Sequence, residues 1–158
     1  MKKIFLIFLL PILFSCSSDS DSPERFTLDT TVHLKLQNAS GENLFNTPNF
    51  NPDDFRIFNI IDGQAEEVSN GNLDYPRNFM MIEAESGTVM RLFLNDNQRM
   101  EFPETIVKWN ATQSDTLRAG YRLSTSSIII EKVWLNGDLV WQAPGANQAL
   151  AREITIVK

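Results

Sequence analysis

Residues 26–37, with the sequence FTLDTTVHLKLQ, carry the clearest strand pattern in the chain. In a strand every second side chain points the same way, and one of the two faces here is mostly apolar: Phe26, Leu28, Thr30, Val32, Leu34 and Leu36. The other face is polar and holds the chain's only histidine, His33. This alternation predicts a strand with one face in the core and the other in water. We expect His33 to be an ordinary surface histidine.

Further short strand patterns follow, separated by turn residues. They cover residues 55–61, a weaker stretch ending at Val68, and residues 78–85, 88–94, 104–110, 116–123, 127–135, 139–143 and 150–157. No stretch keeps a helical period. About nine short strands with frequent turns predict an all-β fold, a single antiparallel β-sandwich of the immunoglobulin-like or prealbumin-like Greek-key type. A small β-barrel is the alternative.

The dipeptide Asn136-Gly137 marks the sharpest hairpin, because both central residues of a type I′ turn need a positive φ. A two-residue turn here predicts two cross-strand pairs, Trp134 with Leu139 and Lys132 with Trp141. The apolar residues expected on one face are Ile128, Ile130, Trp134, Leu139 and Trp141, with Lys132 lying across Trp141. If this face is exposed, Trp134 and Trp141 form a platform for sugar rings; the alternative is that both tryptophans belong to the core.

Composition limits the classes of function. The 158 residues carry a formal charge of −6, and no basic cluster stands out, so we expect no nucleic-acid partner. Three pairs of acids come close in sequence: Asp53 with Asp54, Glu66 with Glu67, and Glu83 with Glu85. The first two lack the dense spacing of a calcium loop, and the third resembles any pair of surface acids on a strand. We expect no enzyme activity, no cofactor and no metal; a carboxylate-based hydrolase is a remote alternative.

The N-terminal stretch has the order of a secretory signal peptide. Two lysines precede an apolar run over residues 4–14, which is about half of the ~20 residues that a membrane-spanning helix needs. The run ends in Leu13-Phe14-Ser15-Cys16, which resembles the lipobox of bacterial lipoproteins. This resemblance implies cleavage before Cys16 and attachment of lipid to its sulfur. An ordinary signal peptide, with Cys16 near the cut by chance, is the alternative.

The predicted domain organisation follows from this processing. Residues 1–15 form the lipoprotein signal peptide, residues 16–25 the lipidated cysteine and its tether, and residues 26–158 the β-sandwich. Loss of Lys2 and Lys3 with the signal lowers the formal charge from −6 to −8. Cys16 is the only cysteine, so its lipidation leaves no thiol for a disulfide or a metal site.

Residues 17–24, SSDSDSPE, contain no apolar side chain and predict a flexible spacer. The run resembles the Ser/Asp/Glu-rich segment that directs lipoproteins of Bacteroidetes to the outer face of the outer membrane. The resemblance implies a lipid-anchored protein of the outer membrane exposed on the cell surface, with the periplasmic face as the alternative.

Asp115-Thr116-Leu117 resembles the short sites at which Bacteroidetes O-glycosylate exported proteins, which makes Thr116 a candidate glycosylation site. Asp29-Thr30-Thr31 also matches, but Thr30 falls on the predicted inner face.

Several segments together resemble small uncharacterised outer-membrane lipoproteins of the Bacteroidetes (Flavobacteria-like) with a C-terminal β-sandwich domain. They include KWN at 108–110, IEKVW at 130–134, LNGDLVW at 135–141 and REITIVK at 152–158. The resemblance implies a location and a β architecture, with no reaction attached. We therefore expect a non-enzymatic, lipid-anchored protein that binds or scaffolds an envelope protein or glycan at the outer membrane. The alternative is a surface glycan-binding accessory lipoprotein that uses exposed aromatic residues.

Overall fold

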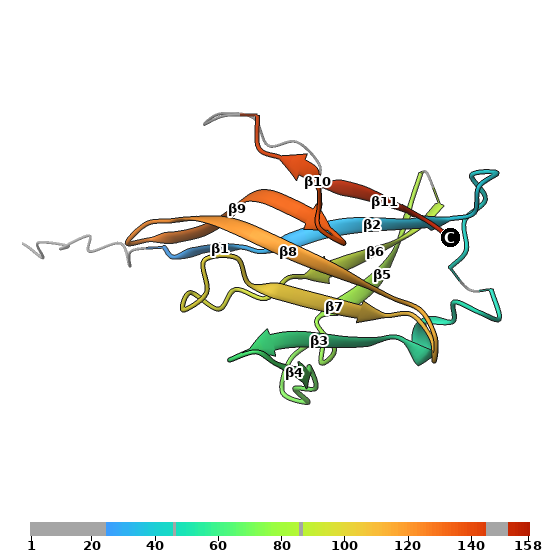
Figure 1. Cartoon of the computed structure of the whole chain (residues 1–158), viewed down its shortest axis with the longest axis horizontal. Coiled ribbons are helices and arrows are strands. Elements are labelled where there is room, and N and C mark those ends of the chain that lie inside the picture. The colour runs from blue at the N-terminus through green and yellow to red at the C-terminus, as the bar shows by residue number, and fades with distance from the viewer. Residues whose placement is uncertain (1–24, 46, 86, 145–151) are drawn as a thin grey trace, which may run out of the picture.

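A computed structural model of the chain describes residues 25–45, 47–85, 87–144 and 152–158. These residues form eleven β-strands and no α-helix, and the strands lie in two sheets packed face to face (Figure 1). The predicted all-β sandwich is therefore confirmed, with more strands than the nine expected. The predicted signal peptide, Cys16 and most of the tether lie outside the described residues.

The two sheets differ in size. Seven strands form the large sheet, in the order β1 (Thr27–Asp29), β9 (Ser127–Leu135), β8 (Ser114–Leu123), β7 (Glu104–Lys108), β3 (Arg56–Ile61) and β4 (Gln64–Glu67), with β10 (Asp138–Gln142) also paired to β9. Four strands form the small sheet, in the order β11 (Glu153–Val157), β2 (Thr31–Gln37), β6 (Gly87–Phe93) and β5 (Phe79–Ala84). A 3-10 turn, η1 (Pro52–Asp54), precedes β3.

The strand order follows the immunoglobulin-like alternative. Strands β2-β6-β5 face β8-β7-β3-β4, which is the neighbour order of strands B-E-D and G-F-C-C′ in that fold. Strands β9 and β10 extend the large sheet beyond β8. Two pairs run parallel, β1 with β9 and β11 with β2. In each pair, a strand from one terminus of the domain lies beside an inner strand of its sheet.

The stretch 26–37 forms two strands, so the prediction of one continuous strand was wrong. β1 pairs in the large sheet and β2 in the small sheet, and the chain crosses between them at Thr30, whose carbonyl accepts a hydrogen bond from the Leu94 amide. The predicted alternation still holds along β2, because Val32, Leu34 and Leu36 all point into the core. The two sheets pack on the same core, so the chain can pass from one sheet to the other at Thr30 and still point the same series of side chains inward.

The core centres on Trp109, which is fully buried. The Phe55 ring packs edge-on against it with centroids 5.2 Å apart, and the Phe45 ring lies 6.2 Å away. Neither of the tryptophans singled out in the hairpin holds this position. Trp109 directly follows Lys108, the last residue of β7.

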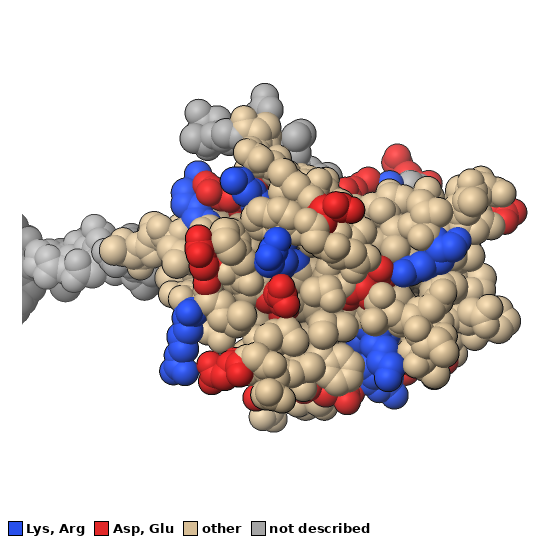
Figure 2. Space-filling model, viewed as in Figure 1, with Lys and Arg blue, Asp and Glu red and all other residues tan. Residues whose placement is uncertain are grey.

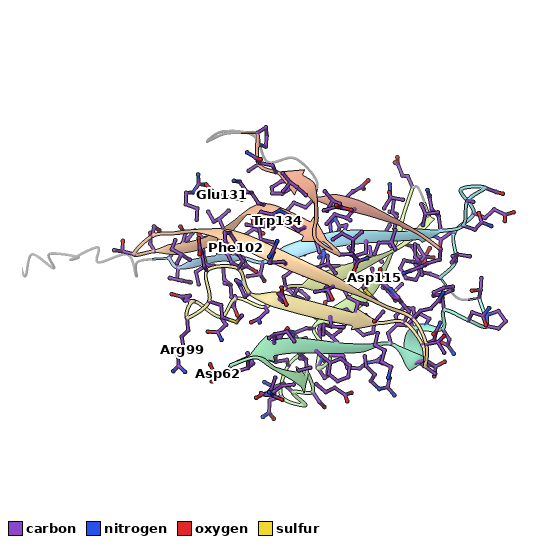
Figure 3. All side chains as sticks on the ribbon, in the orientation of Figure 1. Asp62, Arg99, Phe102, Asp115, Glu131 and Trp134 are labelled. Atoms are coloured by element: carbon purple, nitrogen blue, oxygen red, sulfur yellow. The ribbon has the colours of Figure 1, made fainter. Side chains whose placement is uncertain are left out.

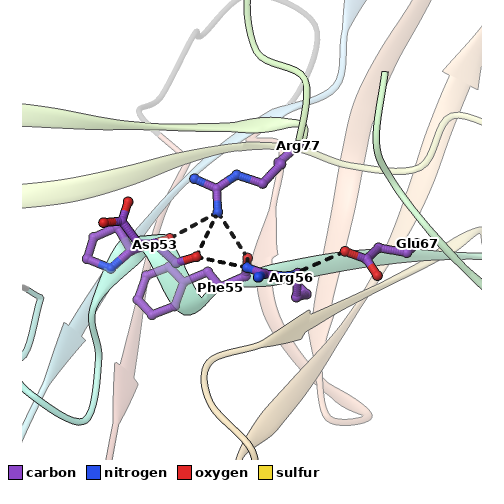
Figure 4. A network of polar contacts seen from close by, with 6 residues as sticks. Asp53, Phe55, Arg56, Glu67 and Arg77 are labelled. Atoms are coloured by element: carbon purple, nitrogen blue, oxygen red, sulfur yellow. Dashed lines mark hydrogen bonds and ion pairs between the residues drawn. The ribbon is translucent and has the colours of Figure 1, made fainter. Parts of the chain in front are cut away.

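Arg77 joins the two layers at one corner, beside Arg56 (Figure 4). Arg77, just before β5, donates from Nη1 to the carbonyl oxygens of Asp53 and Phe55, at 3.2 and 3.3 Å. Arg56 donates to the same two carbonyls and lies 3.5 Å from the Glu67 carboxylate. These bonds satisfy backbone acceptors in the turn that leads from η1 into β3.

Candidate functional site

Trp134, Phe102 and Arg118 form an aromatic platform on the outer face of the large sheet. Trp134 in β9 lies directly opposite Arg118 in β8. The Phe102 ring, from the loop before β7, meets the Trp134 ring edge-on with centroids 5.3 Å apart (Figure 3). The Arg118 guanidinium carbon lies 5.1 Å from the Trp134 ring centre and 5.8 Å from that of Phe102. Each of the three side chains therefore restrains the other two.

Gly120 lies beneath this arrangement. A Cβ atom at Gly120 would lie 3.4 Å from two carbons of the Trp134 ring and 3.5 Å from the Phe102 ring. A methyl group at this position would be in ordinary van der Waals contact with both rings, so the rings lie directly over the backbone of β8. Trp134 stays half-buried and Phe102 remains 38% exposed, so both offer apolar surface to solvent.

Two cationic side chains, Lys132 and Arg118, lie on this face. Lys132 is exposed and pairs in register with Gly120 on one side and Gln142 on the other. Among the described residues, neither Lys132 nor Arg118 has a carboxylate oxygen within 4.0 Å. Their N–H groups are therefore available as hydrogen-bond donors beside the rings. Charges of both signs are interspersed over this face of the molecule (Figure 2).

Trp141 lies on the opposite face, which corrects the prediction that it shares a face with Trp134. The pair of Trp134 with Leu139 forms as predicted, but Val140 is an extra residue in β10, so Trp141 pairs with Val133 and Lys132 with Gln142. Trp141 consequently packs against the core, under the Arg152 guanidinium at 5.2 Å. The one-residue bulge at Val140 reverses the face of the sheet to which the following side chains of β10 point.

A second irregularity separates Trp134 from the isoleucines expected beside it. Tyr121 pairs with Ile130 and Gly120 with Lys132, so Glu131 is an extra residue in β9. Ile128 and Ile130 are buried before this point, and Val133 is buried after it. Trp134 therefore points outward.

Asp115 is a buried acid with three polar partners, and its contacts stabilise the fold. Its carboxylate accepts hydrogen bonds from Trp109 Nε1 at 2.5 Å and Asn136 Nδ2 at 2.7 Å, and it lies 2.6 Å from Lys158 Nζ. Burial alone would raise the pKa of Asp115, but the bonds from Lys158, Asn136 and Trp109 outweigh it and lower that pKa. A carboxylate fully occupied by three donors has little capacity for chemistry. From the sequence alone, Asp115 stood out only as part of a glycosylation motif.

Thr116, the candidate glycosylation site, is half-buried in the middle of the large sheet. Its amide donates to Asn136 Oδ1 and its carbonyl accepts from the Asn136 amide. O-glycosylation of Thr116 stays a prediction. Thr30, the weaker candidate, is buried.

His33 lies on the outer face of the small sheet, half-buried beside Arg91. Its Nε2 accepts a hydrogen bond from Arg91 Nε at 3.1 Å. Partial burial and the positive charge of Arg91 lower the pKa of His33, although Glu153 opposes them. The neutral imidazole is thus the form that the fold stabilises.

The acidic pairs take ordinary positions. Glu83 accepts a hydrogen bond from Thr88 across the β5–β6 hairpin, and Glu85 is exposed at its end. Asp53 and Asp54 belong to η1, and Glu67 meets Arg56. Within the described part of the chain, no three His, Cys, Asp or Glu side chains gather in a way that would hold a metal ion.

None of the described residues forms a helix that is long and apolar enough to cross a membrane. Comparison with known proteins found no family model, no curated protein and no solved structure that matches this chain.

Proposed function

We propose that this chain is a non-enzymatic, lipid-anchored protein of the outer membrane that binds saccharides on the aromatic platform of Trp134, Phe102 and Arg118. The observation that supports the proposal is the half-buried Trp134 ring, which lies over Gly120 between an aromatic edge and a guanidinium. The lipobox-like residues 13–16 and the Ser/Asp-rich tether support the location. The cell surface is the preferred side of that membrane, with the periplasmic face as the alternative.

A saccharide suits the chemistry of this surface. The faces of pyranose rings carry C–H groups that pack on aromatic rings, while their hydroxyl groups need hydrogen-bond partners around the edge. Trp134 supplies the apolar surface, and Arg118 and Lys132 supply donors on the same face. Few polar groups around an apolar surface are typical of small-molecule sites. Trp134 and Arg118 stand on paired strands, so little ordering of the backbone is needed at these two residues on binding.

The binding test uses tryptophan fluorescence after a glycan-array screen. Trp109 is buried and Trp141 packs against the core, so a bound sugar should change mainly the emission of Trp134. We expect Trp134→Ala to abolish the response and Gly120→Val, which lifts the rings, to weaken binding at least tenfold. Val157→Ala, an exposed apolar residue on β11, is the matched control and should leave affinity unchanged. No response across the array, with all variants folded, would refute saccharide binding.

The anchoring test is membrane fractionation. The full chain should sediment with membranes at high salt, and the Cys16→Ala chain should not. Protease treatment of intact cells then distinguishes the two faces: loss of the domain places it outside, and protection until lysis places it in the periplasm. A Cys16→Ala chain that sediments with membranes as completely as the wild-type chain would contradict lipid anchoring.

A further inference from the structure

One end of the sandwich is open, and it is the end at which the chain enters the domain. The β8–β9 hairpin and β1 extend past the strands of the small sheet at this end (Figure 1). Leu28 and Leu123 lie on either side of Ile128 in register, so they share the inward face of this overhang. The small sheet does not cover them, and they remain 55% and 53% exposed. Phe26, two residues before Leu28, is 56% exposed.

A groove lies beneath the overhang. It has a volume of about 400 Å³, and its apolar lining includes Leu28 from the large sheet and Leu73, Tyr75 and Phe93 from the other side. The Tyr75 and Phe93 rings stack with centroids 5.8 Å apart and form a flat wall. We call the exposed apolar residues Phe26, Leu28, Leu73, Tyr75 and Leu123 the apolar rim; they are five of the nine exposed large hydrophobic side chains in the described part of the chain.

We infer that the apolar rim rests on the lipid bilayer and seats the domain on the membrane by this end. The inference rests on the lipid anchor of the proposed function. Nine peptide steps separate Cys16 from Arg25, and an extended chain of that length reaches at most about 30 Å. A diacylglyceryl group on Cys16 therefore keeps the rim within reach of the bilayer, where contiguous exposed apolar side chains gain contact with lipid.

The charges around the rim match a zwitterionic lipid surface. Arg25, next to Phe26 in the chain, is exposed, and Arg99 is exposed at this end (Figure 3); both suit the phosphate of a lipid headgroup. Asp74 and Asp96 border the groove, and they suit the ammonium group of phosphatidylethanolamine. The Asp29 carboxylate, by contrast, is already held by Arg152 through two hydrogen bonds. Tyr75 has the amphipathic ring that is enriched where proteins meet the headgroup region.

The first arm of the test uses the lipidated chain, in which Cys16 is blocked and an introduced cysteine is the sole free thiol. Leu123→Cys and Val157→Cys are labelled with a polarity-sensitive dye and reconstituted into vesicles of phosphatidylethanolamine with some phosphatidylglycerol. Val157 is the matched control, because it is 57% exposed and lies on β11. We expect the dye at position 123 to shift to the blue and to be quenched by lipid-bound nitroxide at least threefold more than at 157. Equal, water-like signals at both positions would overturn the inference.

The second arm separates the rim from the anchor. The Cys16→Ala chain carries no lipid, and we expect it to float weakly with the same vesicles at high lipid concentration. Leu28→Ser with Leu123→Ser should lower the floating fraction at least fivefold, and Val157→Ser should leave it unchanged. Equal flotation of the rim variant would overturn the inference even if the anchor is real. A wild-type chain that remains soluble would instead refute the anchor, while this arm still decides whether the rim binds lipid.

Discussion

The indole nitrogen of Trp109 donates a hydrogen bond of 2.5 Å to Asp115, and both side chains are buried. The same carboxylate binds Lys158, the residue after β11. One acid thus connects the central tryptophan of the core, the large sheet and the C-terminal end of the small sheet. Its removal leaves three donors without their partner.

We predict that Asp115→Ala lowers the free energy of unfolding by about 3 kcal/mol, because breaking a buried ion pair leaves an uncompensated charge. Trp109 Nε1 and the Lys158 ammonium lose their acceptor. Urea unfolding measured by Trp fluorescence gives the change. Glu66→Ala, an exposed acid on β4, is the control and should stay within about 0.5 kcal/mol of wild type. A similar small change for Asp115→Ala would show that the network contributes little.

Two turns with the same backbone geometry, at Asn136 and Asp62, allow the stability contributed by side-chain hydrogen bonds to be measured apart from that of the backbone. Asn136 and Asp62 both have positive φ, and each precedes a glycine in a two-residue turn. Asn136→Gly should cost about 1–2 kcal/mol, because the Asn136 amide bonds Asp115 and its Oδ1 accepts from Thr116. Asp62→Gly should change stability by less than half as much, because no such bonds involve its side chain among the described residues. Chemical denaturation of the two variants checks this; equal losses would contradict the assigned role of Asn136.

Protonation of His33 should destabilise the protein in mildly acidic solution. The pKa of His33 is lowered below 6.5 in the fold, so the unfolded chain takes up its proton at a higher pH than the folded one does. The free energy of unfolding therefore falls as pH decreases through about 6.5. His33→Gln should flatten the dependence in this window. Urea midpoints measured from about pH 7.5 to 5.5 test it, and an unchanged slope would assign the dependence to other groups.

Arg152 and Asp29 should be energetically coupled. Their two hydrogen bonds join the residue before β11 to the last residue of β1, and they lower the pKa of Asp29 against the effect of burial. A double-mutant cycle with Arg152→Met and Asp29→Asn should give a coupling of about 1 kcal/mol, a modest value because Asp29 is partly exposed. The coupling is present above the unfolded pKa near 3.8 and disappears as pH falls below it. Additive effects at pH 7 would contradict the pairing.

The strand pattern could be read from sequence because alternation is a local property. Val32, Leu34 and Leu36 point inward as their spacing predicts, and Asn136-Gly137 makes the turn that its φ requirements favour. Assignment of strands to sheets is not local. β1 and β2 form one uninterrupted pattern, and only their different partners, β9 and β6, divide them at Thr30.

The candidate site was harder to predict than the fold. Trp134 was identified as a possible platform residue, but Trp141 was placed on the same face. Single extra residues, Val140 in β10 and Glu131 in β9, reverse the alternation, and no composition signal marks either one. Phe102 and Arg118 were missed because the first lies in a loop and the second on a neighbouring strand; Gly120, inside a strand pattern, was a usable signal of close packing.

The sequence by itself determined the all-β class, the turns and which side of β2 faces the core, because these depend on side-chain alternation and on backbone preferences of neighbouring residues. The tertiary structure alone decided which tryptophan is central, which one points outward and which apolar residues remain uncovered at the end of the sandwich. Those outcomes depend on strand register, bulges and the unequal reach of the two sheets. Each is set by contacts between segments far apart in the chain, as Asp115 with Lys158 and Asp29 with Arg152 show.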